Sequence, residues 1–482
     1  MSEQAYVREI TDKSKDISRW YTDVVLKAEL ADYSPVRGTM VIRPYGYSIW
    51  ENIQRELDRR FRDTGHQNAY FPLLIPESFL LKEAEHVAGF APQVAWVTQG
   101  GDEELTERLA IRPTSEAIIG YMYSKWIQSW RDLPVLINQW ANIVRWEKET
   151  RFFLRTMEFL WQEGHTVHAT LDEAEEETLR MLGVYKAFAE EFLSIPVVAG
   201  RKTESEKFAG ALRTYSIEAL MPDGKALQAG TSHNLGQNFS HAFDITFLDR
   251  DGQRKFAWQT SWGVSTRLMG GLIMAHGDDS GLVLPPRVAP IQVVVVPIGM
   301  KETADDPVAQ LAAEVEERLR KAQIRVQVDR RPEYTPGWKF NEWEMRGVPL
   351  RLEIGPREVE RRQVFTSRRD TRAKRPLPMN DLEDQVGALL ETFQSDLLEK
   401  GRQFVRQHTS TVSSFDEFKR ALAENPGFVR SLWCGRAECE ARIKDETAAT
   451  IRNLPFDEPE VRGKCVCCGE EAATMAWFAK AY

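Results

Sequence analysis

The stretch Arg145–His165, RWEKETRFFLRTMEFLWQEGH, decides the fold of this chain of 482 residues. It predicts a strand, a charged turn and a returning strand. Because side chains alternate along a strand, Arg145 and Glu147 are expected on one face of the first strand. The same rule groups five residues on one face of the second strand: Arg155, Phe159, Trp161, Glu163 and His165. Guanidinium, aromatic and carboxylate groups together suit a nucleotide better than a core, although an exposed, salt-bridged hairpin is the alternative.

Two further segments accompany this hairpin. Tyr47–Phe61 has apolar residues at helical spacing and runs into NAYFPLLIP at Asn68–Pro76, while Trp258–Gly277 joins a predicted strand to a helix rich in small residues. Taken with Arg145–His165, these segments resemble motifs one, two and three of the class II aminoacyl-tRNA synthetases.

Several shorter stretches narrow the resemblance to the prolyl-tRNA synthetase family of the archaeal and eukaryotic type. These are RPTSE (112–116), FAPQVAWVT (90–98), GTSHNLGQNFS (230–240), GLVLPPRVAP (281–290) and WKFNEWEMRGVPLRLEIGPR (338–357). The resemblance covers nearly the whole chain. It implies an α/β (α+β multidomain) protein with an antiparallel-sheet catalytic domain, an α/β anticodon-binding domain and a small C-terminal zinc-binding α+β domain.

The chain length predicts about three domains at ~150 residues each. We expect a catalytic domain at 1–285, an anticodon-binding domain at 286–400 and a zinc-binding domain at 401–482, with the first boundary at the prolines of 285–290. The second domain begins with a βαβ pattern: a strand at 291–298, an amphipathic helix at 306–321 and a strand at 324–329. A helix over Leu382–Gln407 leads to the third domain, where Ser414–Glu417 reads as a capping box.

The resemblance implies that the carboxylate of an amino acid attacks the α-phosphate of ATP, so the protein positions reactants and neutralises charge. The residues matching catalytic positions are Arg145, Arg155 and Arg267. The residues matching nucleotide-binding positions are Arg145, Glu147, Arg155, Thr156, Phe159, Gln228, Thr231, Ser265 and Arg267. Gln228 is expected near a Mg²⁺ ion that bridges phosphate oxygens, although a structural amide is the alternative.

The resemblance also implies a pocket for proline, which combines a secondary ammonium with a compact apolar ring. The residues matching this pocket are Thr114, Glu116, Arg145, Phe90, Trp161, Glu163, His165 and His233. Each has a structural alternative, because Trp161 suits a core, Glu163 suits an ion pair and a lone histidine is often structural. Asn234 stands where some relatives have a second histidine, and Ser265 where others have threonine.

His165 and Ser261 are 96 positions apart, too few for the editing domain that bacterial-type relatives insert between motifs two and three. Editing within the chain is therefore not expected. Because a few missing methylenes change discrimination by only ~1–3 kcal/mol, a proline pocket cannot strongly exclude a smaller amino acid. We expect alanine and cysteine to be activated, and a separate editing factor to be needed.

The expected partners are tRNA(Pro), L-proline, ATP and a second copy of the chain. Candidates for contact with the anticodon are Glu342, Arg346, Arg351 and Arg368, in and around a stretch, 346–375, with ten basic and four acidic residues. An ordinary solvated surface is the alternative for that stretch. The resemblance implies a homodimer through the Tyr47–Phe61 helix, although packing within its own domain would equally explain the apolar face.

All five cysteines lie between Cys434 and Cys468, which argues against a disulfide framework and for a local metal site. Cys434, Cys439, Cys465 and Cys468 form two pairs whose spacing suits a structural Zn²⁺ ion. Cys467 is the alternate to Cys468, and buried free cysteines are the other interpretation.

The net charge of −9 excludes a protein that coats nucleic acid indiscriminately. The charged start of the chain and the absence of a long apolar run predict a cytoplasmic location without a membrane segment. Two other functions remain open. One is a class II synthetase for another amino acid, and the other is a regulatory paralogue that binds tRNA or a metabolite without catalysis.

Overall fold

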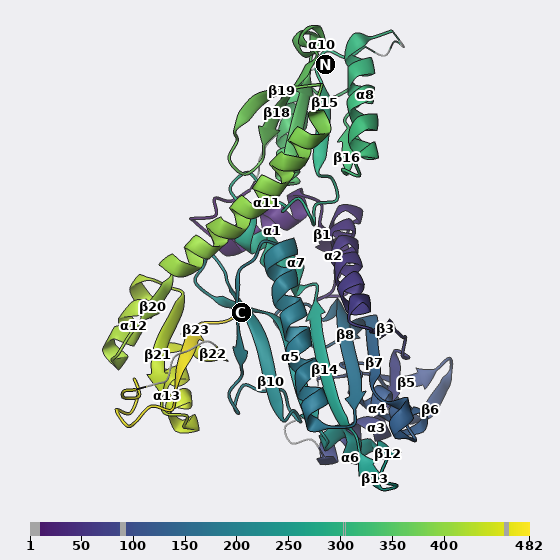
Figure 1. Cartoon of the computed structure of the whole chain (residues 1–482), viewed down its shortest axis with the longest axis vertical. Coiled ribbons are helices and arrows are strands. Elements are labelled where there is room, and N and C mark those ends of the chain that lie inside the picture. The colour runs from purple at the N-terminus through teal and green to yellow at the C-terminus, as the bar shows by residue number, and fades with distance from the viewer. Residues whose placement is uncertain (1–9, 87–92, 302, 304, 457–461) are drawn as a thin grey trace.

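The computed structural model describes residues 10–86, 93–301, 303, 305–456 and 462–482. A sheet of eleven strands forms its centre (Figure 1). In spatial order its strands are β20 (Thr409–Thr411), β21 (Phe428–Trp433), β23 (Thr474–Ala479), β22 (Thr450–Pro455), β9 (Val197–Arg201), β10 (Arg213–Leu220), β11 (Ala226–Gly236), β14 (Trp258–Ser265), β8 (Glu158–His168), β7 (Val135–Val144) and β3 (Gln67–Asn68). The pairs within it are antiparallel except β20–β21 and β3–β7. This confirms the mixed α/β architecture with an antiparallel catalytic sheet.

Long helices cover one face of the central sheet, with α5 lying across β11 and β14 (Figure 1). The helices of this layer are α1 (Ile17–Lys27), α2 (Pro44–Asp63), α5 (Leu171–Ala187) with a π-helical turn at Phe188–Phe192, and α7 (Arg267–His276). Their apolar faces form the largest core, which includes Trp20, Trp50, Leu57 and Trp262. The helical spacing in Tyr47–Phe61 is confirmed, and the apolar face of α2 packs within its own chain.

A second core lies beside β7 and β8. It is built by α3 (Glu77–His86), α4 (Glu116–Trp126), α6 (Asn238–Phe243) and a sheet with the order β4 (Leu74–Pro76), β6 (Glu103–Ile111), β5 (Ala95–Gly100). The remaining elements of this part are two hairpins, β1 (Ala31–Tyr33) with β2 (Met40–Ile42) and β12 (Thr246–Leu248) with β13 (Arg254–Phe256), and a 3₁₀ turn at Trp130–Asp132.

The second predicted domain is a separate mixed sheet with its own core. Its strands, in order, are β16 (Val326–Val328), β15 (Val293–Pro297), β17 (Leu350–Ile354), β18 (Gln363–Arg368) and β19 (Lys374–Pro378). The helices are α8 (Pro307–Lys321), α9 (Pro336–Met345) and α10 (Pro356–Arg361). β15 pairs in parallel with β16, as the βαβ pattern predicts.

Helix α11 (Leu382–Gln407) runs from this sheet to the C-terminal unit, with the predicted bounds (Figure 1). The unit contains α12 (Phe415–Glu424) and α13 (Ala437–Thr447), and the capping box of Ser414 and Glu417 at the start of α12 is confirmed. Strand β22 of this unit pairs with β9 of the catalytic sheet. The sheet therefore continues across the predicted boundary near residue 400, and the bounds of the three domains stay predictions.

The hairpin of Arg145–His165 differs from its prediction. β7 ends at Val144 and β8 begins at Glu158, so the expectation that Arg145, Glu147 and Arg155 lie on strand faces is wrong. The physical reason is the segment Phe152–Leu154, whose three side chains are buried in the main core and pull the chain out of the ladder. The helices in the described ranges are all too short or too polar to cross a bilayer.

Candidate active site

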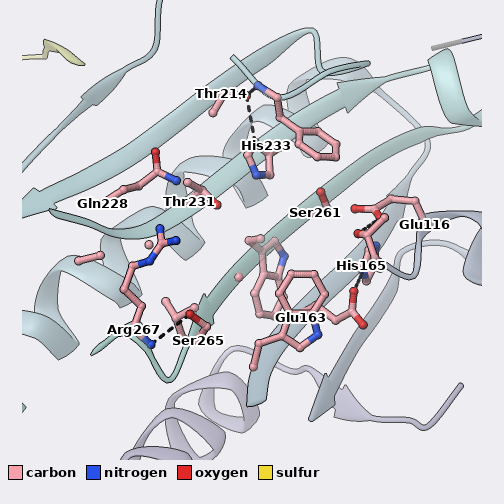
Figure 2. A pocket seen from close by; sticks show the side chains of 18 of the residues that line it. Glu116, Glu163, His165, Thr214, Gln228, Thr231, His233, Ser261, Ser265 and Arg267 are labelled. Atoms are coloured by element: carbon pink, nitrogen blue, oxygen red, sulfur yellow. Dashed lines mark hydrogen bonds and ion pairs between the residues drawn. The ribbon is translucent and has the colours of Figure 1, made fainter. Parts of the chain in front are cut away.

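A cavity of about 340 Å³ opens on the face of the central sheet opposite α5 (Figure 2). Most of the predicted site residues line it: Thr114, Glu116, Arg145, Phe159, Trp161, Glu163, His165, Gln228, Thr231, His233, Ser265 and Arg267. Strand register explains this gathering, because paired residues on neighbouring strands point to the same side. Across the cavity floor, His233 pairs with Ser261, and Ser261 pairs with His165.

Gly263 lies at the centre of this floor. It pairs with Thr231 on one side and with Glu163 on the other, and all three residues line the cavity. Without a side chain at this position, the middle of the floor stays open between the two ends of the pocket. A Cβ atom there would also lie 2.9 Å from a backbone oxygen of β8.

Two guanidinium groups lie toward one end of the cavity, those of Arg267, which is half-buried, and of Arg145, which is exposed. Arg145 donates from Nε to a backbone carbonyl oxygen at 3.0 Å, and its guanidinium lies 5.7 Å from the Phe159 ring and 5.5 Å from the Trp161 ring. Arg267 donates from Nε to a backbone carbonyl oxygen at 3.2 Å. Desolvation by the surrounding protein lowers the pKa of both guanidinium groups, and neither has an ion pair with a carboxylate in the described part of the chain. Cations of this kind favour an anionic ligand.

Three predicted nucleotide residues lie beside the cavity rather than in its lining. Arg155 donates to Glu147 Oε2 at 2.9 Å from Nε, with a side chain that is 55% exposed. The hydroxyl of Thr156 donates to a backbone carbonyl oxygen at 2.8 Å. Phe90, predicted for the proline pocket, lies outside the described residues.

A hydrogen-bonded carboxylate forms the opposite end. Glu163 accepts from Ser115 Oγ at 2.5 Å and Gln139 Nε2 at 2.8 Å, and its second oxygen lies 2.9 Å from His165 Nε2. Burial alone would raise the pKa of Glu163, but these partners hold it below its ordinary value. Burial opposes the charge on His165, yet Glu163 raises the pKa of His165. Glu163 therefore both lines the pocket and forms an ion pair with a neighbouring base, His165.

The hydroxyl of Thr114 donates to Glu116, whose carboxylate also lines the cavity. Both side chains are more than nine-tenths buried at the start of α4. They present an anionic group beside the Glu163–His165 pair. This end of the cavity thus combines carboxylates for an ammonium group with the apolar face of Trp161.

Gln228 and Thr231 lie on β11, with Gln228 at the Arg267 end of the cavity and Thr231 nearer its middle (Figure 2). A bulge in the pairing of β10 and β11, between Ile217 and Glu218, falls beside Gln228. Bulges often re-aim side chains next to functional sites. The Gln228 amide has no hydrogen-bond partner within the described ranges, so its carbonyl oxygen is free to bind a ligand or a cation.

Several lining residues were missed by the sequence analysis. They are Glu206, Lys207, Phe208, Thr214 and Ser261. Thr214 and Ser261 are set in the cavity by strand register, and Glu206–Phe208 belong to the connection between β9 and β10. The only local signal is that Ser261 has the same parity as Ser265 on β14. Thr214 lies on β10 and can be found only by knowing that it pairs with His233 of β11.

The four preferred cysteines meet in the C-terminal unit. The sulfur atoms of Cys434, Cys439, Cys465 and Cys468 all lie within 4.8 Å of one another, and Cys467 is not in the group. Cys468 Sγ lies 3.7 Å from Cys434 Sγ. A tetrahedral zinc site with Zn–S bonds of ~2.3 Å separates its sulfur atoms by about 3.8 Å, so the cluster fits zinc.

The anticodon candidates are engaged in ion pairs. Arg351 bonds Glu353 at 2.9 Å, and Arg368 bonds Asp370 at 2.6 Å. Glu342 pairs with Arg331 and lies 3.4 Å from Arg346. Arg346 also pairs with Glu29 of the catalytic domain, so this arginine contributes to the contact between two domains.

Family models match three parts of the chain. The tRNA synthetase class II core domain (G, H, P, S and T) matches residues 96–276, the anticodon binding domain matches residues 292–389, and the prolyl-tRNA synthetase C-terminal domain matches residues 415–482.

Curated relatives match the chain over nearly its full length. The chain is 58% identical to proline--tRNA ligase 2 of Clostridioides difficile over 100% of this chain and 99% of that protein. It is also 58% identical to proline--tRNA ligase of Natranaerobius thermophilus over 99% of both chains. Among solved structures, prolyl-tRNA synthetase from Cryptosporidium parvum complexed with L-proline and AMP has a TM-score of 0.94 and 42% identity, covering 100% of this chain and 99% of that one.

Proposed function

This chain belongs to the prolyl-tRNA synthetase family of class II synthetases, and we propose that it attaches L-proline to tRNA(Pro) in two steps. In the first, a carboxylate oxygen of proline attacks the α-phosphorus of ATP and pyrophosphate leaves, which gives prolyl-adenylate. In the second, a terminal ribose hydroxyl of the tRNA attacks the acyl carbon and AMP leaves.

The observation that carries this proposal is that one cavity holds positive charges toward one end and negative charges at the other. The guanidinium groups of Arg145 and Arg267, which have no carboxylate partner in the described ranges, lie toward one end, and the carboxylates of Glu116 and Glu163 lie at the other. ATP needs cations around its phosphates, and the proline ammonium needs an anion. Glu116 and Glu163 act electrostatically on the Arg145 guanidinium from one side, and Arg145 acts on Arg267 at the other, so Arg145 suits both the α-phosphate and the proline carboxylate.

The remaining roles follow from the same geometry. Arg267 and Phe159 would sandwich the adenine ring, with a guanidinium on one face and an aromatic ring on the other. Glu147, Arg155 and Thr156 would approach the nucleotide from the mouth of the cavity. These contacts hold the reactants in line and stabilise the charge that develops at phosphorus, so the reaction needs no nucleophilic side chain.

Mg²⁺ is expected as the counterion of ATP, and when bound it would neutralise charge on the phosphates. The free carbonyl oxygen of Gln228 is a hard donor of the kind that Mg²⁺ prefers, so the site fits this ion. The chain's own contribution is to orient the phosphates with Arg145 and Arg155.

The direct test is exchange of labelled pyrophosphate into ATP, measured with proline, alanine, cysteine, threonine and serine in turn. We expect proline to support the fastest exchange, and Arg145→Ala to abolish it. Arg402→Ala, which removes a surface guanidinium, is the control that should leave exchange unchanged. Exchange driven by another amino acid would point to a different synthetase, and exchange with none of them to the regulatory paralogue.

Misactivation and the lack of internal editing are part of the proposal. Every residue from Thr166 to Thr260 is described, and the strands these residues form belong to the catalytic sheet or the small β12–β13 hairpin, which leaves no segment for an editing domain. Alanine-dependent adenylate should therefore form and should require a separate editing factor. The absence of any alanyl-adenylate under saturating alanine would contradict this.

We propose Zn²⁺ for the cluster of Cys434, Cys439, Cys465 and Cys468. A closed site of four thiolates leaves no position for water, so the metal would stabilise the C-terminal unit rather than act in catalysis. Metal analysis offers a matched pair of variants. Cys468→Ser should lose zinc and lower the melting temperature, whereas Cys467→Ser should keep one zinc per chain.

The proposal also includes a cytoplasmic homodimer and recognition of the anticodon by the β15–β19 domain. Since α2 buries its apolar face in its own core, a dimer must use other surfaces near this helix, where Tyr47 and Tyr70 are exposed. Sedimentation equilibrium measures the dimer directly. For the anticodon, Arg351→Ala should weaken aminoacylation without changing pyrophosphate exchange.

A further inference from the structure

A buried hydroxyl lies directly behind one of the proline-pocket residues. Thr214 on β10 pairs with His233 on β11, and Thr214 Oγ1 lies 2.9 Å from His233 Nδ1 (Figure 2). Both residues line the cavity, but Thr214 is almost fully buried and His233 is the more accessible of the two. The geometry therefore joins a nearly inaccessible hydroxyl to an imidazole that a ligand can reach.

The partners of this hydroxyl fix the direction of the hydrogen bond. The backbone N–H of Phe208 donates to Thr214 Oγ1 at 3.0 Å, so the oxygen already accepts one hydrogen bond. Within the part of the chain that the structure describes, the only atom to which the hydroxyl can donate is His233 Nδ1, at 2.9 Å. A buried hydroxyl proton without an acceptor costs about 1–3 kcal/mol. Donation from the hydroxyl to an Nδ1 atom that carries no proton avoids this cost.

The environment of His233 keeps the imidazole neutral. Burial, and to a smaller extent the nearby charge of His165, lower its pKa to about 3. The Phe208 ring packs on the imidazole with a centroid distance of 4.8 Å and an interplanar angle of 36°, which holds the ring in place. A neutral imidazole with a bare Nδ1 has its single proton on Nε2.

Nε2 lies on the other side of the ring from Thr214, and no residue of the described ranges accepts a hydrogen bond from it. His233, Ser261 and His165 follow one another across the cavity floor. Proline carries acceptors only on its carboxylate, because its ring is apolar and its ammonium is a donor. A fixed N–H donor at this place thus matches an acyl oxygen of proline or of its adenylate.

We propose that Thr214 is a positioning residue that sets the tautomer of His233, so that His233 presents an Nε2–H donor to an acyl oxygen of the bound amino acid. This inference rests on the proposed function for the identity of the ligand. The tautomer itself depends only on the side chains of Thr214, Phe208 and His233, and it can be measured without substrate.

The first measurement is the ¹⁵N spectrum of the intact protein labelled at its histidine rings, with the His233 signals assigned by their loss in His233→Gln. We expect a neutral ring protonated at Nε2 at pH 7. A ring protonated at Nδ1, or at both nitrogens, would overturn the proposal whatever the activity of the enzyme.

The second measurement compares variants of Thr214 in pyrophosphate exchange. Thr214→Val keeps the shape but removes the donor, so the KM for proline should rise about tenfold, the factor for one hydrogen bond of ordinary strength, while the KM for ATP stays constant. The His233 spectrum of Thr214→Val should also gain the Nδ1-protonated form. Thr214→Ser should restore both properties.

Thr178→Val is the matched control. It removes another buried threonine hydroxyl, which does not line the cavity and donates to a backbone oxygen of α5 with a donor–acceptor distance of 2.7 Å. This change should leave the KM for proline and the His233 spectrum unchanged. An unchanged KM and spectrum in Thr214→Val would overturn the proposal. A wild-type enzyme with the Nε2–H form but without proline-dependent exchange would contradict the proposed function and leave the tautomer assignment standing.

Discussion

Two groups of charged side chains lie on the same face of the central sheet and differ in whether their charges are paired. In the cavity, Arg145 and Arg267 have no carboxylate partner among the described residues. Next to it, at the contact with the C-terminal unit, Lys202 Nζ lies 2.8 Å from Glu218 Oε1, and Arg452 lies 3.0 Å from Glu218 Oε2. Glu218 is opposite Gln228 of the cavity in the strand register.

The charges of the second group, Lys202, Glu218 and Arg452, are paired with one another. Lys202 also donates to the backbone oxygen of Arg452 at 2.6 Å, and all three side chains are nearly inaccessible. Burial would raise the pKa of Glu218, but the two cations hold it below its ordinary value. A paired group of this kind holds the C-terminal unit to the catalytic sheet, whereas unpaired guanidinium groups keep their binding capacity for a ligand. The comparison separates charges that stabilise the fold from charges that the fold reserves for function.

The largest effect is expected from breaking the paired group. Glu218→Gln leaves two buried cations without a counter-charge, which should lower the free energy of unfolding by about 3–5 kcal/mol. Chemical denaturation measures this change. In a double-mutant cycle, Arg452→Met should cost less in the Glu218→Gln background than in the wild type, and strictly additive losses would contradict the pairing.

The unpaired group should respond in the opposite way. Arg267→Met should reduce the rate of pyrophosphate exchange by about 10²–10³-fold, the range for losing one preorganised electrostatic contact, while the melting temperature stays the same or rises. The matched control is Arg325→Met, because Arg325 donates to three backbone oxygens outside the cavity. Arg325→Met should lose stability but keep its exchange rate, and a loss of stability in Arg267→Met would remove the distinction.

A smaller effect is expected from the Glu163–His165 pair, which is paired yet belongs to the cavity. The folded state raises the pKa of His165, so its stabilisation is full below the unfolded value of ~6.5 and is lost as the pH rises through the folded value. The lowered pKa of Glu163 gives stabilisation above ~4.3 that is lost as the pH falls through the folded value.

The contribution of this pair should therefore be greatest between about pH 4.3 and 6.5. Thermal unfolding of the wild type and of His165→Gln over pH 4–9 measures it. The difference between the two proteins should reach about 1.5–3 kcal/mol in that window and decline above it, as for a charged hydrogen bond. A difference that is constant with pH would mean that the pair is not ionised.

The smallest effect is expected where paired charges face water. Arg402 bonds Glu190 at 3.2 Å with a side chain that is 46% exposed. Arg402→Ala should change the free energy of unfolding by no more than about 1 kcal/mol, because solvent and salt screen exposed pairs. A change as large as that of Glu218→Gln would show that burial is not what distinguishes the two pairs.

The local elements were predicted well because their signals are local. The period of apolar residues and the capping groups gave α11 its bounds, and the capping box at Ser414 marks the start of α12. The motif residues of the cavity were found by their resemblance to the family, and twelve of them line it together. The strand assignment of Arg145, Glu147 and Arg155 failed because alternation cannot reveal that Phe152–Leu154 is drawn into the core.

The sequence by itself determined the elements, the family and the chemical types of the site, because these depend on neighbouring residues and on motif identity. Only the tertiary structure decided that β22 completes the sheet beside β9, that Arg452 reaches Glu218 across 234 positions, and that Thr214 stands behind His233. These contacts depend on strand register between distant segments. Register is set by the packing of the whole sheet, since a shift of one residue would turn each side chain to the opposite face.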